Sequence, residues 1–188
     1  MSTFDVDVTP PVGSMLSYDP MINSWDMSLR AKGIVLIGAG DPVVLVAVDW
    51  LGIDGESQDA FRKALAEAAG TVPQRVAVHT LHQHDAPRSN FAAERILLNA
   101  GLKPGSYESS FQLEVIDRLR NAVKNSLKNA SPVTHLGTGS ARVYEVASNR
   151  RIMGEDGKVR AVRYTAAANP ALRAEPEGVI DPMVSLVS

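Results

Sequence analysis

Three of the four histidines of this chain lie in one short segment, HTLHQHDAP at residues 79–87. The residues before it, VAV at 76–78, are apolar, and the two β-branched valines predict a strand. On a continued strand, His82 and His84 are two residues apart and point to the same face, whereas His79 points to the opposite one. Two imidazoles that converge where a strand ends commonly bind a metal ion or form an acid–base pair.

The histidine pair alone leaves its role open. An H-x-H spacing is common, and both side chains could be hydrogen-bonded at the mouth of a strand with a structural role only. Asp85 could orient an imidazole, or it could cap the turn that Asp-Ala-Pro predicts. A stable zinc site needs three or four ligands. Beyond the pair, the sequence offers the weaker candidates His79, His135, Asp49 and Asp85.

Two further polar residues lie near predicted strands. Asp49 directly follows the apolar run VVLVAV at 43–48. It could line the site, or it could have a structural role as the partner of a loop backbone or an arginine. We favour the structural role, because burying an unpaired acid is costly. Arg150 follows Asn149 and has a planar donor group suited to an oxyanion or a hydroxyl. A solvated basic turn is the plainer interpretation, since Arg151 stands beside it.

The composition excludes several classes of function. A net charge of −2 offers no basic field for nucleic acid, and the absence of cysteine excludes disulfides, thiolate ligands and a cysteine nucleophile. The sequence GTGS at 137–140 fits no nucleotide-binding frame. We expect no transmembrane segment. Residues 1–11 lack the features of a signal peptide, so the sequence predicts a cytoplasmic location by default. If a leader was removed, the protein would be secreted or periplasmic.

The hydrophobic pattern predicts a mixed α/β domain with helices packed on a mixed β-sheet. Strands are expected at 4–9, 29–37, 43–48, 75–80 and 159–165, with two more separated by a glycine kink in 133–146 and strand character in 179–188. The second and third should form a hairpin, with the third central in its sheet. Helices are expected at 56–69, 90–99 and 107–129, and irregular loops at 12–25 and 166–178. We expect one domain over 1–188 that forms part of a larger catalytic domain.

The order of these segments resembles the N-terminal catalytic domain of the neutral/alkaline (non-lysosomal) ceramidases, in the form of a truncated bacterial relative. The residues that carry the resemblance are VDVTPPVG at 6–13, VVLVAVDWLGI at 43–53, TLHQHDAP at 80–87, VASNR at 146–150 and GVIDPMVSLV at 178–187. The third of these is similar to the family's T-H-T-H-S-G-P signature, and the fourth to its Ser-Ile-Asn-Arg motif.

The resemblance implies a zinc-dependent hydrolase of a linear amide bond, which in the family is the amide of ceramide. It implies that His82 is the first zinc ligand, that His84 lies beside the metal and contacts substrate, and that Arg150 contacts the substrate's polar head. Zinc would polarise the carbonyl and activate water. The family's other ligands, a histidine, a glutamate and a tyrosine, lie further along than this chain reaches. We therefore expect weak zinc binding and little or no activity from this chain alone.

Two other hypotheses stay open. The chain could be a non-catalytic α/β domain that binds a small molecule or a partner chain, with structural histidines. It could also belong to a metal hydrolase that acts on a different amide or ester, because Asp85 and Ala86 stand where the family has Ser-Gly. The expected partner is a small-molecule or lipid amide. The acyl-chain preference and homo-oligomerisation are left open.

Overall fold

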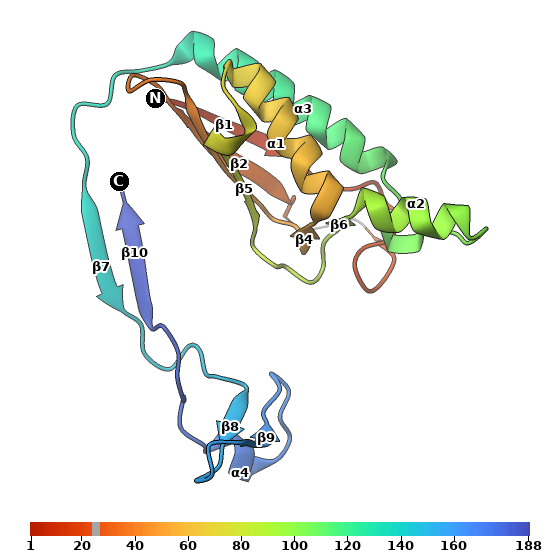
Figure 1. Cartoon of the computed structure of the whole chain (residues 1–188), viewed down its shortest axis with the longest axis vertical. Helices are drawn as coiled ribbons and strands as arrows, with labels where there is room; N and C mark the ends of the chain where they lie inside the picture. Colours follow the sequence, from red (N-terminus) through yellow and green to blue (C-terminus); the bar gives the residue numbers. More distant parts are fainter. Residues whose placement is uncertain (24–26) are drawn as a thin grey trace. The chain divides into compact units, whose positions relative to one another are not determined.

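The computed structural model describes residues 1–23 and 27–188. The chain divides into two compact units, Met1–Pro132 and Val133–Ser188, and each is described by itself (Figure 1). The expectation of a single domain over 1–188 stays a prediction. No helix in the described parts of the chain is long and apolar enough to cross a membrane.

A four-stranded mixed sheet forms the centre of the first unit. Its strands lie in the order β1 (Ser2–Asp7), β2 (Arg30–Leu36), β3 (Val43–Val48) and β5 (Val76–Thr80). The pairs β1–β2 and β2–β3 are antiparallel and β3–β5 is parallel. The predicted hairpin and the central place of β3 are therefore confirmed. A short parallel pair, β4 (Gly52–Ile53) with β6 (Arg88–Ser89), was not predicted because two residues give no period.

The helices also lie close to where the sequence predicts them. They are α1 (Gly55–Ala69), α2 (Phe91–Asn99) and α3 (Ser110–Ser126), with 3₁₀ turns at Pro73–Arg75, Gly105–Tyr107 and Leu127–Asn129. Helix α1 ends at Gly70, whose φ of 68° suits a left-handed C-cap. The side chain of Asn90 caps α2 by accepting from the backbone N–H of Ala93. In place of the single helix predicted at 107–129, the structure has the 3₁₀ turn ending at Tyr107, then α3, and then the 3₁₀ turn at Leu127–Asn129.

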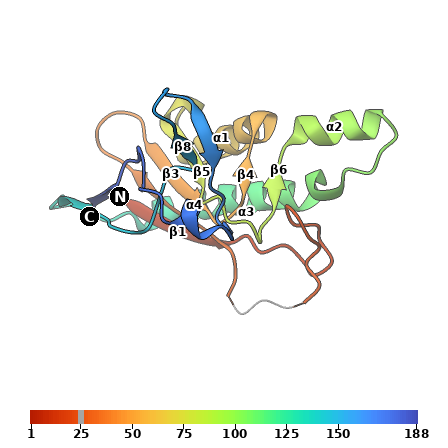
Figure 2. The same cartoon turned by 90° about the horizontal axis from the view of Figure 1, so that it is seen from below.

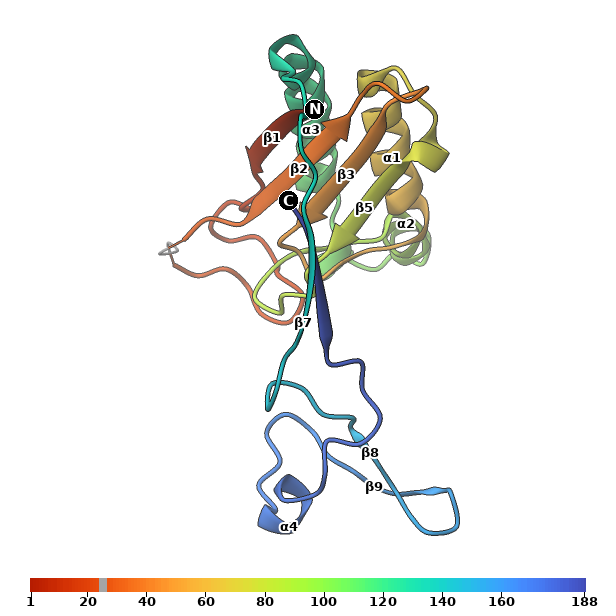
Figure 3. The ribbon, with the colours of Figure 1, turned by 90° about the vertical axis from the view of Figure 1, so that its left-hand side faces the viewer.

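Helices α1 and α3 cover one face of the sheet (Figure 3). Burial alternates along β3: Val44, Val46 and Val48 are buried under the helices, whereas Leu45 on the opposite face is 39% exposed. From the helices, Phe61 and Leu119 are among the buried side chains that meet this face. Helix α2 extends beyond the sheet at the end where β4 and β6 lie (Figure 2). The α/β class and the helices packed on a mixed sheet are confirmed.

The second unit contains two short antiparallel ribbons. They are β7 (Thr138–Arg142) with β10 (Met183–Val187) and β8 (Arg151–Met153) with β9 (Val159–Val162), and a short helix α4 (Pro170–Arg173) follows. The prediction of two strands with a glycine kink in 133–146 is wrong. Gly139 lies inside the single strand β7, where it pairs with Leu186, and a glycine in that extended ladder causes no kink. Helix α4 lies in the segment expected to be a loop.

Candidate functional site

The histidine segment leaves the sheet at the carboxyl end of β5. The strand ends at Thr80, so His82 and His84 lie in a loop and not, as predicted, on a continued strand. The two rings nevertheless converge, with centroids 5.1 Å apart and an interplanar angle of 76°. The loop conformation, rather than strand alternation, brings them together. Both side chains are exposed and thus accessible to a ligand.

The chain after β3 anchors this loop. The backbone N–H of Leu81 donates to the carbonyl of Val48 and that of His82 donates to Trp50, each at 3.1 Å. Trp50 is fully buried, and its indole N–H donates to the carbonyl of Val8 at 3.0 Å. The N–H of Leu51 donates to the carbonyl of Pro87 at 3.0 Å, so backbone hydrogen bonds fix the loop at both its first and its last residues.

His82 has a left-handed backbone conformation and a ring that is hydrogen-bonded through Nδ1. Its φ of 59° lies in the left-handed region, which costs about 1–3 kcal/mol for a residue with a side chain and is often found at functional sites. Its Nδ1 lies 3.1 Å from the carbonyl oxygen of Leu51. Because a carbonyl only accepts, this contact assigns a proton to Nδ1, and when the ring is neutral Nε2 carries the lone pair. This arrangement is typical of a metal-ligating histidine.

Tyr18 is a third aromatic side chain in this cluster, and the sequence did not single it out. Its ring centroid lies 5.3 Å from that of His84, with the planes tilted by 53°. The only signal in the sequence was its place in a loop with apolar anchors. That loop was expected at 12–25, and its last two residues lie outside the described residues.

The two aspartates near the histidines do not orient an imidazole. The carboxylate of Asp49 accepts from the backbone N–H of Arg30 at 2.8 Å, so it bonds a backbone, as the favoured interpretation held, but the backbone is that of strand β2 and not of a loop. The backbone N–H of Asp85 donates to the side-chain oxygen of Gln83, which closes a tight turn. Among the described residues, the carboxylate of Asp85 makes no hydrogen bond with either ring.

The other two histidines, His79 and His135, have other surroundings within their own units. His79 is on β5 with its side chain on the open face of the sheet, beside Lys32 and Ala47. His135 belongs to the second unit and has Nδ1 3.0 Å from the hydroxyl of Thr134. Within residues 1–23 and 27–188, no group of three or more His, Asp or Glu side chains could hold a metal ion. Because a stable zinc site needs three or four ligands, the described residues do not form a complete one.

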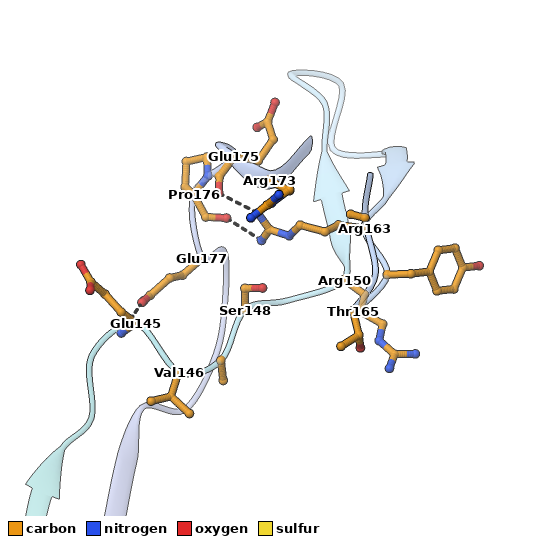
Figure 4. Close-up of a pocket in the computed structure, with 13 residues that line it drawn as sticks. Glu145, Val146, Ser148, Arg150, Arg163, Thr165, Arg173, Glu175, Pro176 and Glu177 are labelled. Carbon is orange, nitrogen blue, oxygen red and sulfur yellow. Dashed lines mark hydrogen bonds between the residues drawn. The ribbon is translucent and has the colours of Figure 1, made fainter. Parts of the chain in front are cut away.

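Arg150 belongs to the second unit, where it lines a cavity of about 870 Å³ (Figure 4). Its guanidinium carbon lies 6.0 Å from the ring centroid of Tyr164. The same cavity is lined by charged side chains of both signs, which include Arg173, Glu145 and Glu177. In the part of the chain that the structure describes, the guanidinium of Arg150 makes no hydrogen bond, so its donors can reach a ligand.

Asn149, the neighbour of Arg150, has a structural role. Its side chain donates to the carbonyl of Val179 and accepts from the N–H of Arg151, each at 2.9 Å. Its backbone N–H donates to the carbonyl of Glu177 at 2.7 Å. The residue thus joins the two chain segments on either side of the cavity. Asn149 and Arg150 lie between β7, which ends at Arg142, and β8, which begins at Arg151.

Arg163 holds the same region together and was also missed from the sequence. It is only 9% exposed, and its guanidinium donates to four backbone carbonyl groups. The acceptors and distances are Asn149 at 3.3 Å, Leu172 at 3.1 Å, Glu175 at 2.7 Å and Pro176 at 3.0 Å. Arg163 directly follows the short strand β9, and nothing in the sequence there indicates that an arginine will be buried.

Comparison with known proteins places this geometry in a known fold. No protein-family model and no curated protein match the chain. Among solved structures, it is similar to the neutral ceramidase from Pseudomonas aeruginosa, with a TM-score of 0.63 and 18% identity over 100% of this chain and 28% of that one. A ceramidase complexed with C2 gives a TM-score of 0.55 and 18% identity over 79% of this chain and 24% of that one. The chain spans about a quarter of the length of these enzymes. The resemblance predicted from the motifs is thus confirmed at the level of the fold: this chain has the α/β fold of part of a neutral ceramidase.

Proposed function

We propose that the chain provides the first part of the active site of a zinc-dependent hydrolase that cleaves a linear amide bond, as in the ceramidases. The observation that carries the proposal is His82. Its Nδ1 is within hydrogen-bond distance of the carbonyl of Leu51 and its backbone is left-handed, so the neutral ring would present the lone pair of Nε2 to a metal ion. The ring lies at the carboxyl end of the sheet, where α/β folds commonly place ligands.

The donor set fits the beginning of a zinc site. Neutral imidazole is a preferred zinc ligand, which suits His82, and the ring of His84 lies 5.1 Å from it, beside the proposed metal position. The remaining ligands would come from the part of the ceramidase fold that this chain does not span. When bound, zinc would supply Lewis-acid activation of an amide carbonyl and of water. Because the set is incomplete, this chain alone should bind zinc weakly and have little or no activity.

The roles of the other residues follow from their surroundings. His84 is accessible and would contact the substrate beside the metal. Arg150 would donate hydrogen bonds to a polar group of the substrate, because its guanidinium is exposed and Asn149 fixes the backbone on which it stands. A lipid amide of the ceramide kind is the first substrate class to test. Both units would then be parts of one larger catalytic domain.

Zinc titration by calorimetry tests the proposal. We expect weak binding by the wild type, loss of binding in His82→Ala and unchanged binding in His79→Ala. His79 is the matched control because it lies in the same segment but inside β5, on the open face of the sheet. Equal binding by the wild type and His82→Ala would contradict the metal assignment and would favour a non-catalytic domain with structural histidines.

A further inference from the structure

Residues 13–21 form a compact loop that is closed on itself. Backbone hydrogen bonds join Gly13 to Met21 at 2.7 Å and Met21 to Ser14 at 2.9 Å. At the tip, the N–H of Leu16 donates to the carbonyl of Asp19 at 2.9 Å, which makes a four-residue turn with Ser17 and Tyr18 at its centre. The loop therefore holds Tyr18 at a fixed place, with 59% of its side chain exposed.

The tip of this loop is fastened to the histidine segment. The backbone N–H and the hydroxyl of Ser17 both donate to the carbonyl of Ala86, at 3.0 and 2.7 Å. In the other direction, the guanidinium of Arg88 donates to the carbonyl of Ser17 at 2.8 Å. Ser17 and Ala86 are buried, so water competes little for these three bonds. Residues 17 and 86–88 thus form one rigid junction.

Arg88 also packs between aromatic side chains. Its guanidinium carbon lies 5.7 Å from the ring centroid of Tyr18 and 5.4 Å from that of Tyr107, and it donates to the hydroxyl of Tyr107 at 3.2 Å. The side chain of Gln112 donates to the carbonyl of Arg88 at 3.0 Å. The ring of Tyr18 is therefore supported by a cation that is itself fixed.

His84 depends on these contacts for its orientation. Among the described residues, no hydrogen bond holds its ring, and its aromatic contacts are Tyr18 at 5.3 Å and His82 at 5.1 Å. We propose that Tyr18 is a positioning residue: with Arg88 behind it, its ring holds the imidazole of His84 in the orientation that faces His82. The importance of this orientation for catalysis rests on the proposed function, but the contact itself can be tested without zinc.

The test compares metal-free NMR spectra of the histidine rings at one pH. The ring current of Tyr18 displaces the proton resonances of His84 in the wild type. In Tyr18→Leu these resonances should move, while those of His79 and His135 stay in place. Tyr18→Phe keeps the ring and should preserve the wild-type positions. Arg88→Met leaves both rings intact but removes the support, so it should move the resonances of His84 in the same way as Tyr18→Leu.

Zinc titration of the same proteins adds the functional readout. Loss of the aromatic contact should weaken zinc binding by about three- to tenfold in Tyr18→Leu and hardly at all in Tyr18→Phe. Tyr144→Leu is the control, because Tyr144 is an exposed tyrosine stacked near Arg142 in the second unit. Unmoved resonances of His84 in Tyr18→Leu would overturn the inference. If the wild type binds no zinc, the proposed function fails, and the metal-free spectra still decide whether Tyr18 orients His84.

Discussion

Replacing Arg163 by methionine is expected to release the segments around Arg150. Methionine keeps much of the length of the side chain but removes the guanidinium that donates to four backbone carbonyls between 2.7 and 3.3 Å. A hydrogen bond from a charged group contributes about 1.5–3 kcal/mol, and bonds from one side chain are not additive. Counting only the two shortest at the lower value gives about 3 kcal/mol of local stability.

That loss corresponds to about a hundredfold rise in the local opening constant. Hydrogen exchange followed by mass spectrometry measures it on peptides that contain Asn149 and Arg163, whose N–H groups donate to Glu177 and Arg150. The exchange rate of these amides should rise about a hundredfold, while peptides from α3 in the first unit stay unchanged.

Arg160→Met is the matched control for this prediction. Arg160 is half exposed and pairs with the carboxylate of Glu175 at 2.5 Å, and a surface pair of this kind contributes about 0–1 kcal/mol. In Arg160→Met, the exchange rates of the same amides should therefore stay within about fivefold of the wild type. Equal exchange in Arg163→Met and the wild type would refute the claim that Arg163 holds the backbone beside Arg150.

Two further predictions concern the first unit. Leu119→Ala should lower the free energy of unfolding by about 2.7–5 kcal/mol in urea denaturation, because Leu119 is fully buried, whereas Leu113→Ala, on the exposed side of α3, should change it by less than about 0.5 kcal/mol. Desolvation acts to raise the pKa of Asp7, but hydrogen bonds from Thr9 and the charge of Arg30 outweigh it and the net pKa is lowered. Its contribution to stability is therefore present above the unfolded pKa of about 3.9 and lost as pH falls through the lower folded value, so Asp7→Asn should flatten the acid limb of a pH–stability curve. An unchanged acid limb would contradict this, although the effect is small because the side chain is 46% exposed.

Periodicity made most of the first unit predictable. Apolar residues at every fourth position of α3 arise because this helix buries one face, and a buried face leaves a pattern in the sequence. Strand β3 was predicted from its continuous apolar, mostly β-branched run VVLVAV, although its burial alternates in the structure. Gly70 and Asn90 marked the two helix ends that they cap. The second unit was predicted less well, because β7 and β10 are exposed along their whole length and bury no face that would set a pattern.

The sequence singled out candidate site residues but could not predict their contacts. The spacing of His82 and His84 correctly indicated that the rings converge, although the strand geometry behind that prediction was wrong. The bond from His82 to Leu51 joins residues 31 positions apart, and the packing of Tyr18 against His84 joins two loops. Such contacts depend on the tertiary fold and leave no short-range signal.

The central claim is that Nε2 of His82 binds zinc while Nδ1 stays bonded to the carbonyl of Leu51. Anomalous diffraction from zinc-soaked crystals of the chain tests it most directly. We expect a zinc peak about 2.0–2.1 Å from Nε2 of His82, with the bond to Leu51 intact. Zinc bound elsewhere while Nε2 of His82 remains free, at a concentration that saturates the calorimetric titration, would contradict the account.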